Sequence, residues 1–128
     1  MTPKEAYFYA LNIIKGRWPA AESIILTDSQ YTYYYAKYII KGRWMEGEPI
    51  ILTNPVWAYH YTEDIIKGRW PEAELIILTN PECTYYYVRY VIKGRWPKAE
   101  PIILKGPYAK IYYETFLKPH TNWQIEGF

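Results

Sequence analysis

Arginine and glutamate recur at a fixed spacing along this chain, and both are residues whose charge can do chemistry. Four arginines in a row of equivalent positions could bind phosphates or carboxylates. The alternative is that each arginine forms an ion pair with a glutamate, either five residues on or in the next unit. We favour the ion pair, because packing demands strict repetition whereas a binding site varies between units. The residues are Arg17, Arg43, Arg69 and Arg95, with Glu22, Glu48, Glu74 and Glu100.

A second group of residues combines aromatic and basic side chains at helical spacing. Aromatic rings beside cations can stack bases while the cations neutralise phosphates, or they can act as hot spots for a protein partner. The alternative is an ordinary solvated helix face with tyrosines lying along it, and the sequence leaves both open. The two aromatic–basic–basic trios are Tyr34, Lys37, Lys41 and Tyr86, Arg89, Lys93; the equivalent positions elsewhere hold Phe8, Leu11, Lys15 and His60, Glu63, Lys67.

Some positions alternate between odd and even units, which indicates a true period of 52 residues. Tyr38 and Tyr90 stand where the other units have Asn12, Asp64 and Phe116. A recent duplication of a pair of units explains this alternation. The other explanation is a pair of equivalent pockets, each bracketed by Tyr38 or Tyr90, for a small anionic ligand such as a nucleotide.

Residues that would support enzyme chemistry are few. His60 and His120 are far apart in sequence, and Cys83 has no evident base partner. A single cysteine at the start of a helix is more often inert packing than a nucleophile. The sequence contains no glycine-rich phosphate loop and no metal-ligand spacing. We therefore expect a protein without enzymatic activity, cofactor or metal.

The elements that position these side chains repeat every 26 residues. Ile13-Ile14-Lys15-Gly16-Arg17-Trp18 recurs three more times without insertion, and an Ile-Ile-Leu block that starts at Ile24 keeps the same period. Such self-similarity is the signature of a repeat architecture. We expect a single domain over 1–128, made of a half unit 1–12, full units 13–38, 39–64, 65–90 and 91–116, and a C-terminal cap 117–128.

Each unit predicts one longer helix, for example from Pro55 to Lys67. Asn54 followed by Pro55 is an N-cap with proline at the first helical position. At the other end, Gly68 suits a left-handed C-cap. Between the caps an apolar stripe with helical spacing runs through Ala58, Tyr61, Thr62 and Ile65.

A shorter helix is expected from about Pro49 to Thr53, with Glu48 near its positive end. Trp-Pro-x-Ala-Glu before it is interpreted as a tight connection. The competing interpretation is a buried strand, because Tyr, Ile, Thr and Val favour strands. The caps and the helical stripe favour helix. Paired helices at a fixed period predict an all-α protein, an α-solenoid of 26-residue two-helix repeats.

The segment Lys67-Gly68-Arg69-Trp70-Pro71-Glu72-Ala73-Glu74 resembles the tandem "KGRWPEAE" repeats of uncharacterised phage and bacterial proteins. The resemblance covers nearly the whole chain except the last dozen residues. It implies a short-helix repeat architecture and a phage origin. It implies no activity.

The ends and the overall charge indicate the kind of partner. Tyr7, Phe8 and Leu11 give the first unit an apolar surface that suggests self-association; alternatively, the tail with Trp123, Ile125 and Phe128 folds over the last unit and the first end tolerates exposure.

A net charge of +2 makes a nucleic-acid polymer an unlikely partner. No apolar run approaches the ~20 residues that span a bilayer. We expect a homo-oligomer or a protein partner in the cytoplasm, the host's if the chain is phage-encoded.

Overall fold

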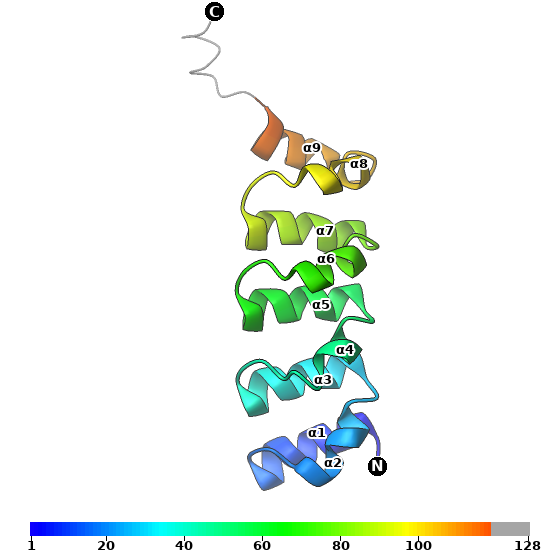
Figure 1. Ribbon diagram of the computed structural model, residues 1–128, viewed down its shortest axis with the longest axis vertical. Coiled ribbons are helices and arrows are strands. Elements are labelled where there is room, and N and C mark those ends of the chain that lie inside the picture. Colours follow the sequence, from blue (N-terminus) through cyan, green and yellow to red (C-terminus); the bar gives the residue numbers. More distant parts are fainter. Residues whose placement is uncertain (119–128) are drawn as a thin grey trace, which may run out of the picture.

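The computed structural model describes residues 1–118, and every regular element in that range is helical. The alternative of a buried Ile-Ile-Leu-Thr strand is therefore wrong. Figure 1 shows the helices stacked one above another along the longest axis, with the N-terminus at one end of the stack and α9 at the other. The predicted cap residues Trp123, Ile125 and Phe128, and His120, lie outside the described residues.

The longer helices begin where the capping residues predict. The side chains of Thr2, Asp28, Asn54 and Asn80 each accept a hydrogen bond from a backbone N–H in the first turn. Each α-helical segment then widens into π-helix, which the sequence did not predict. The α segments are α1 (Pro3–Tyr9), α3 (Ser29–Tyr35), α5 (Pro55–Tyr61), α7 (Pro81–Tyr86) and α9 (Ala109–Tyr112); their π continuations are η1 (Ala10–Ile14), η2 (Ala36–Ile40), η3 (Thr62–Ile66), η4 (Tyr87–Ile92) and η6 (Tyr113–Leu117).

The predicted left-handed cap at Gly68 is wrong by one residue. Lys67 adopts the left-handed conformation, with φ of 60°, and its N–H donates to the Thr62 carbonyl at 2.7 Å. The π-helical turn closes on this bond to the fifth residue back, so the chain reverses at the lysine instead of at the glycine after it. Lys15, Lys41 and Lys93 repeat the geometry.

Three of the shorter helical segments start earlier than predicted, whereas the one expected from about Pro49 starts at Glu48, within one residue of the prediction. Where proline follows the tryptophan, the segment Pro-x-Ala-Glu is helical and not a tight connection, because proline fits the first helical turn. Where Met45 replaces the proline, residues 45–47 form a turn before the helix. The connection is the preceding Lys-Gly-Arg-Trp segment. The elements are α2 (Pro19–Ile25), α4 (Glu48–Ile51), α6 (Pro71–Ile77), and the 3-10 turn η5 (Pro97–Ala99), which leads into α8 (Glu100–Ile103).

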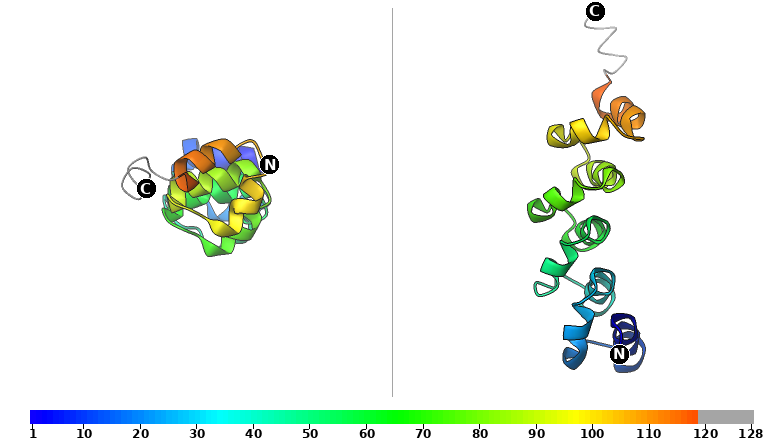
Figure 2. Two further views of the ribbon diagram at one scale, coloured as in Figure 1. Left: turned by 90° about the horizontal axis from the view of Figure 1, so that it is seen from above. Right: turned by 90° about the vertical axis from the view of Figure 1, so that its right-hand side faces the viewer.

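Longer and shorter helices form two columns, as the side view in Figure 2 shows. Small residues on the longer helices, such as Ala58 and Thr62, are fully buried and allow the shorter helices to approach closely. Tyr61 from the predicted stripe is buried as well. In the first unit, however, the equivalent Tyr9 is 42% exposed and Ile13 is 62% exposed. No described residue covers that end of the stack.

Candidate functional site

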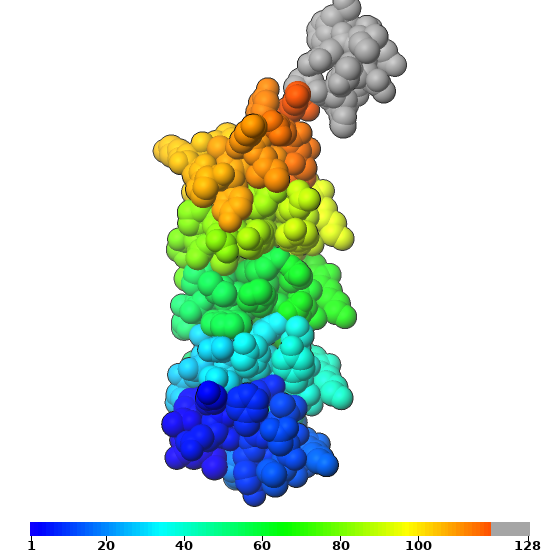
Figure 3. Space-filling view, turned by 180° about the vertical axis from the view of Figure 1, so that it is seen from behind, coloured from blue at the N-terminus to red at the C-terminus, as the bar shows by residue number. Residues whose placement is uncertain are grey.

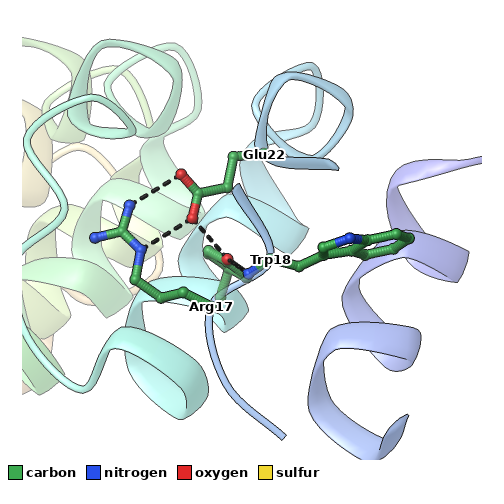
Figure 4. A network of polar contacts seen from close by, with 4 residues as sticks. Arg17, Trp18 and Glu22 are labelled. Atoms are coloured by element: carbon green, nitrogen blue, oxygen red, sulfur yellow. Dashed lines mark hydrogen bonds and ion pairs between the residues drawn. The ribbon is translucent and has the colours of Figure 1, made fainter. Parts of the chain in front are cut away.

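Four polar residues form a network at each junction between units. In the first junction, Arg17 donates through both Nε and Nη2 to the Glu22 carboxylate at 2.9 Å (Figure 4). The Tyr35 hydroxyl donates to the same carboxylate at 2.7 Å. It also accepts a 2.7 Å hydrogen bond from the backbone N–H of Trp18. Tyr35 therefore ties its long helix to the short helix and the connection of the preceding unit.

This network recurs at every later junction in residues 1–118. The pairing of each arginine with the glutamate five residues on is present at all four positions, with N–O distances of 2.8–2.9 Å. The tyrosine hydroxyl bonds to that glutamate and to the tryptophan N–H in each case. The later sets are Arg43, Glu48, Tyr61, Trp44; Arg69, Glu74, Tyr87, Trp70; and Arg95, Glu100, Tyr112, Trp96.

Electrostatics at the junctions favour a structural role for these charges. The hydrogen bond from Arg17 is the main reason that the pKa of Glu22 lies below its ordinary value. Burial raises the pKa of Tyr35 to about 12, so its hydroxyl keeps the proton that it donates. The guanidinium groups use two nitrogens on their own glutamates. Ion pairing with the glutamates therefore accounts for the strict repetition of the arginines, whose side chains remain about half exposed.

The exposed surface of the first unit differs from the predicted one. Tyr7 is only 4% exposed, because its ring packs against Tyr31 and Tyr34 of the next long helix. It cannot form an open self-association surface. Phe8 is 42% exposed on the outer face, and Leu11 lines a hollow beside the second unit. Tyr9 and Ile13 form the uncovered end, at positions equivalent to a buried tyrosine and a half-buried isoleucine in later units.

The first predicted trio does not form one site. Tyr34 is half-buried among other aromatic rings, and Lys37 pairs with Asp64 at 3.2 Å. Burial lowers the pKa of Lys37, but hydrogen bonds with Tyr33 and Asp64 raise it by more, so the lysine is firmly protonated. Lys41 is the left-handed cap; it borders one hollow with Tyr38 and a second with Lys37 and Asp64, and Tyr34 lines neither of them.

The second trio is divided in a similar way. Arg89 is exposed and lies over the Tyr90 ring, 5.6 Å from its centroid. Tyr86 lies in an aromatic hollow with Tyr90, whereas Lys93 caps its helix beside another hollow. Arg89 over Tyr90 repeats Lys37 over Tyr38, where the distance to the centroid is 5.2 Å. The odd–even alternation in the sequence therefore corresponds to a repeated contact, in which a basic side chain lies over the ring of Tyr38 or Tyr90.

Tyr38 and Tyr90 each border a hollow between two left-handed lysines. The hollow of about 230 Å³ at Tyr38 is lined by Lys15, Lys41 and Leu11, with no carboxylate among its lining residues. The hollow of about 180 Å³ at Tyr90 has the equivalent lysines, but Glu63 takes the place of Leu11. The two hollows lie at equivalent positions but differ in charge, because only the Tyr90 hollow contains a carboxylate. The Tyr38 hollow therefore suits an anion better.

The outward positions Phe8, Tyr34, His60 and Tyr86 belong to a larger aromatic surface on the longer helices, which also includes Trp57 and Tyr108, two residues that the sequence did not single out. Ring contacts connect Tyr34 with Trp57 at 5.6 Å, Tyr59 with Tyr86 at 6.0 Å, and Tyr86 with Tyr108 at 6.0 Å. A signal was present in two units, where an aromatic residue stands three positions before the outward one: Tyr31 before Tyr34 and Trp57 before His60. It was hidden because Glu5 and Cys83 occupy the same position in the other two units.

Catalytic and metal-binding groups do not gather in the part of the chain that the structure describes. Burial raises the pKa of Cys83 to about 11, and the residue is 5% exposed. Burial also lowers the pKa of His60, which packs against Trp57 and Tyr59. Within residues 1–118 no three His, Cys, Asp or Glu side chains lie together as metal ligands would. None of the helices in that range has the length and apolar character to cross a membrane.

Comparison with protein-family models finds no match for this chain, and the comparisons with curated proteins and with solved structures find none either.

Proposed function

We propose that this chain is an α-solenoid of 26-residue units that acts as a non-enzymatic interaction or scaffold protein, assembling with itself or with a partner protein. The observation that carries the proposal is the exposed position of Tyr9. Its counterparts Tyr35 and Tyr61 are fully buried and bridge to the preceding unit. No described residue forms a hydrogen bond with the side chain of Tyr9. The first unit thus has the surface of an internal junction, and none of the described residues covers it.

The chemistry of this end face suits association. Ile13 adds apolar area next to the Tyr9 ring, which packs against Trp18 at 4.8 Å between centroids. In repeat proteins, stability comes largely from interfaces between neighbouring units, and exposed apolar ends are normally capped. An uncovered face of this kind gains free energy when another molecule covers it.

Light scattering tests the self-assembly part of the proposal. Across about a hundredfold range of concentration, mass action predicts a weight-average mass that rises above that of the monomer. A constant monomer mass over the whole range would contradict self-assembly and leave only binding to a partner protein. Failure to bind any partner as well would contradict the whole proposal.

The Tyr38 hollow favours a second candidate function, binding of a small anionic ligand such as a nucleotide. Lys15 and Lys41 would face the anion, and the Tyr38 ring would lie beside the base. A thermal-shift screen of nucleotides decides this, because a ligand that binds the folded state stabilises it. Stabilisation that Lys15→Gln abolishes supports the site. No shift at a ligand concentration of about 1 mM argues against it.

The repeat resemblance adds a phage origin to the proposal, and the host cytoplasm is then the place of action. The genes adjacent to this one test the origin. A phage structural cluster would support a scaffold in particle assembly, a counter-defence cluster would support a host partner, and a purely metabolic bacterial cluster would contradict both.

A further inference from the structure

The longer helices carry a continuous row of aromatic side chains on the side that faces away from the shorter helices. We name this row the aromatic stripe and define it by Phe8, Tyr34, Trp57, His60, Tyr86 and Tyr108. Figure 3 shows this side of the molecule as successive bands, from α1 in blue to α9 in orange. Consecutive members touch directly or through the inner rings Tyr7 and Tyr59. The ring centroids in these contacts lie 5.0–6.0 Å apart.

Two adjoining hollows open along the stripe. One of about 290 Å³ is lined by Trp57, Tyr34 and Tyr38 together with the Lys37–Asp64 pair. The next, of about 320 Å³, is lined by Tyr59, Tyr86 and Tyr90 with Glu63, and His60 borders both. Each hollow is large enough for a small apolar ring and lies between two neighbouring long helices. The stripe therefore contains two adjoining aromatic-walled sites.

Hydrogen-bond donors border the first hollow. Neither the indole N–H of Trp57 nor the hydroxyl of Tyr38 donates to another residue among those described, and Tyr38 is 47% exposed. The Tyr34 hydroxyl accepts from Gln30 at 3.2 Å, which leaves its own proton available. An occupant that brings unpaired carbonyl groups would satisfy these donors. A polyproline II helix has no internal hydrogen bonds, and its carbonyls point outward.

Spacing selects the same kind of occupant. Packed helices lie ~8–10 Å apart, and a polyproline II helix makes one turn of three residues in about 9.3 Å. Prolines at every third residue would therefore meet the two hollows in succession and the aromatic rings on either side of them. The four steps from α1 to α9 span ~32–40 Å at this packing distance, which corresponds to a peptide of about twelve residues.

Charge argues against single-stranded nucleic acid on this surface. Grooves that bind single strands combine aromatic stacking with a consistently positive lining. Here Lys37 is neutralised by Asp64, and the second hollow contains Glu63. Near neutrality suits an uncharged proline-rich segment, and aromatic-lined grooves are the usual docking sites for such segments.

We propose that the aromatic stripe binds a proline-rich segment of a partner protein in the polyproline II conformation, with prolines at every third residue. The proposal rests on the interaction function proposed above and names the chemistry of its partner. It does not depend on self-assembly through Tyr9 and Ile13, which lie on the end of the stack and not on the stripe.

Calorimetric titration of the full chain with a synthetic uncharged peptide tests the proposal. The peptide has about twelve residues with proline at every third position. We expect saturable binding, weakened about tenfold or more by Trp57→Ala, as for a central aromatic contact. Tyr38→Ala, at an exposed position where folding is not in question, should weaken binding in the same direction. Leu75→Ala, on the shorter helix α6 and 70% exposed, is the matched control and should leave binding unchanged.

Two comparisons make the result decisive. A peptide of the same composition with proline at every fourth position should bind more weakly, because its prolines do not match the helix spacing. Equal binding of both peptides, or no binding of either, overturns the proposal. Binding of oligo(dT) in place of the peptide also overturns it and shows a nucleic-acid surface. Light scattering on the same samples reports self-assembly separately, so failure of one proposal is distinguishable from failure of the other.

Discussion

The Tyr61 hydroxyl donates a 2.6 Å hydrogen bond to the carboxylate of Glu48, thirteen residues earlier and in the preceding short helix. The same oxygen accepts from the Trp44 backbone N–H at 2.9 Å. Glu48 is only 6% exposed, and Arg43 satisfies its carboxylate from the solvent side. One phenolic hydroxyl thus completes the hydrogen bonding of two buried groups on the neighbouring unit.

Removal of that hydroxyl tests its contribution. Tyr61→Phe leaves the Trp44 N–H without its acceptor and removes one donor from Glu48, so we expect a loss of about 1–3 kcal/mol in the free energy of unfolding. Tyr9→Phe is the matched control at the equivalent position, where the hydroxyl has no described partner, and should change it by less than about 0.5 kcal/mol. Urea denaturation measures both. Equal losses would mean that the hydroxyl bridge does not stabilise the junction.

Acid should weaken the junctions. Burial raises the pKa of Glu48, but hydrogen bonds from Arg43 and Tyr61 lower it by more, so the folded-state pKa lies below its ordinary value. The resulting stabilisation is complete above the unfolded-state pKa of about 4.3 and is lost as the pH falls through the folded-state pKa. Unfolding free energy measured against pH should therefore fall below about pH 5. Glu48→Gln should be less stable at pH 7 and show a smaller fall; a fall of the same size would assign the acid effect to other groups.

The left-handed lysine gives a prediction at the ends of the first four long helices. Lys67→Val should destabilise by about 1–2 kcal/mol, because a side chain branched at Cβ tolerates positive φ poorly. Gly68→Ala should stay within about 0.5 kcal/mol, because its φ is not positive and an added Cβ would meet no atom within 4 Å. Thermal unfolding of the two variants decides the matter. A larger loss of stability in Gly68→Ala than in Lys67→Val would contradict the left-handed turn at Lys67 and support the cap at Gly68 that the sequence predicted.

Cys83 should be chemically inert in the folded chain. Burial and the nearby charge of Glu82 raise the pKa of its thiol to about 11. At pH 8 we expect a thiol-specific disulfide reagent to react about a hundredfold more slowly than after unfolding in denaturant. The denatured sample serves as the control for reagent and thiol. A fast reaction in the native protein would show an accessible thiolate and reopen a chemical role for Cys83.

Local rules predicted the starts of the long helices and the ion pairs between arginine and glutamate. Asn54-Pro55 and Asn80-Pro81 carry their signals in neighbouring residues, and so does the five-residue spacing from Arg17 to Glu22. The π-helical half of each long helix could not be predicted in this way. It places the left-handed turn at Lys67, a residue whose intrinsic preference is against positive φ.

Contacts between units also could not be predicted from local sequence patterns. Tyr7 looked exposed from the position of the first unit, but its ring is covered by Tyr31 and Tyr34. Tyr9 looked like part of the core stripe, yet its covering unit has no counterpart among the described residues. The stripe face at Trp57 also depends on which helices become neighbours, and that arrangement is fixed by packing along the stack.

Sedimentation velocity on two matched lysine variants tests the central claim most directly, namely that the uncovered junction face mediates assembly. Ile13→Lys places a charge on the end face, whereas Leu75→Lys places the same charge at a comparably exposed apolar residue on α6. We predict that the wild type and Leu75→Lys sediment as assemblies at the same concentration and that Ile13→Lys sediments as a monomer. Identical sedimentation of Ile13→Lys and the wild type would contradict the claim.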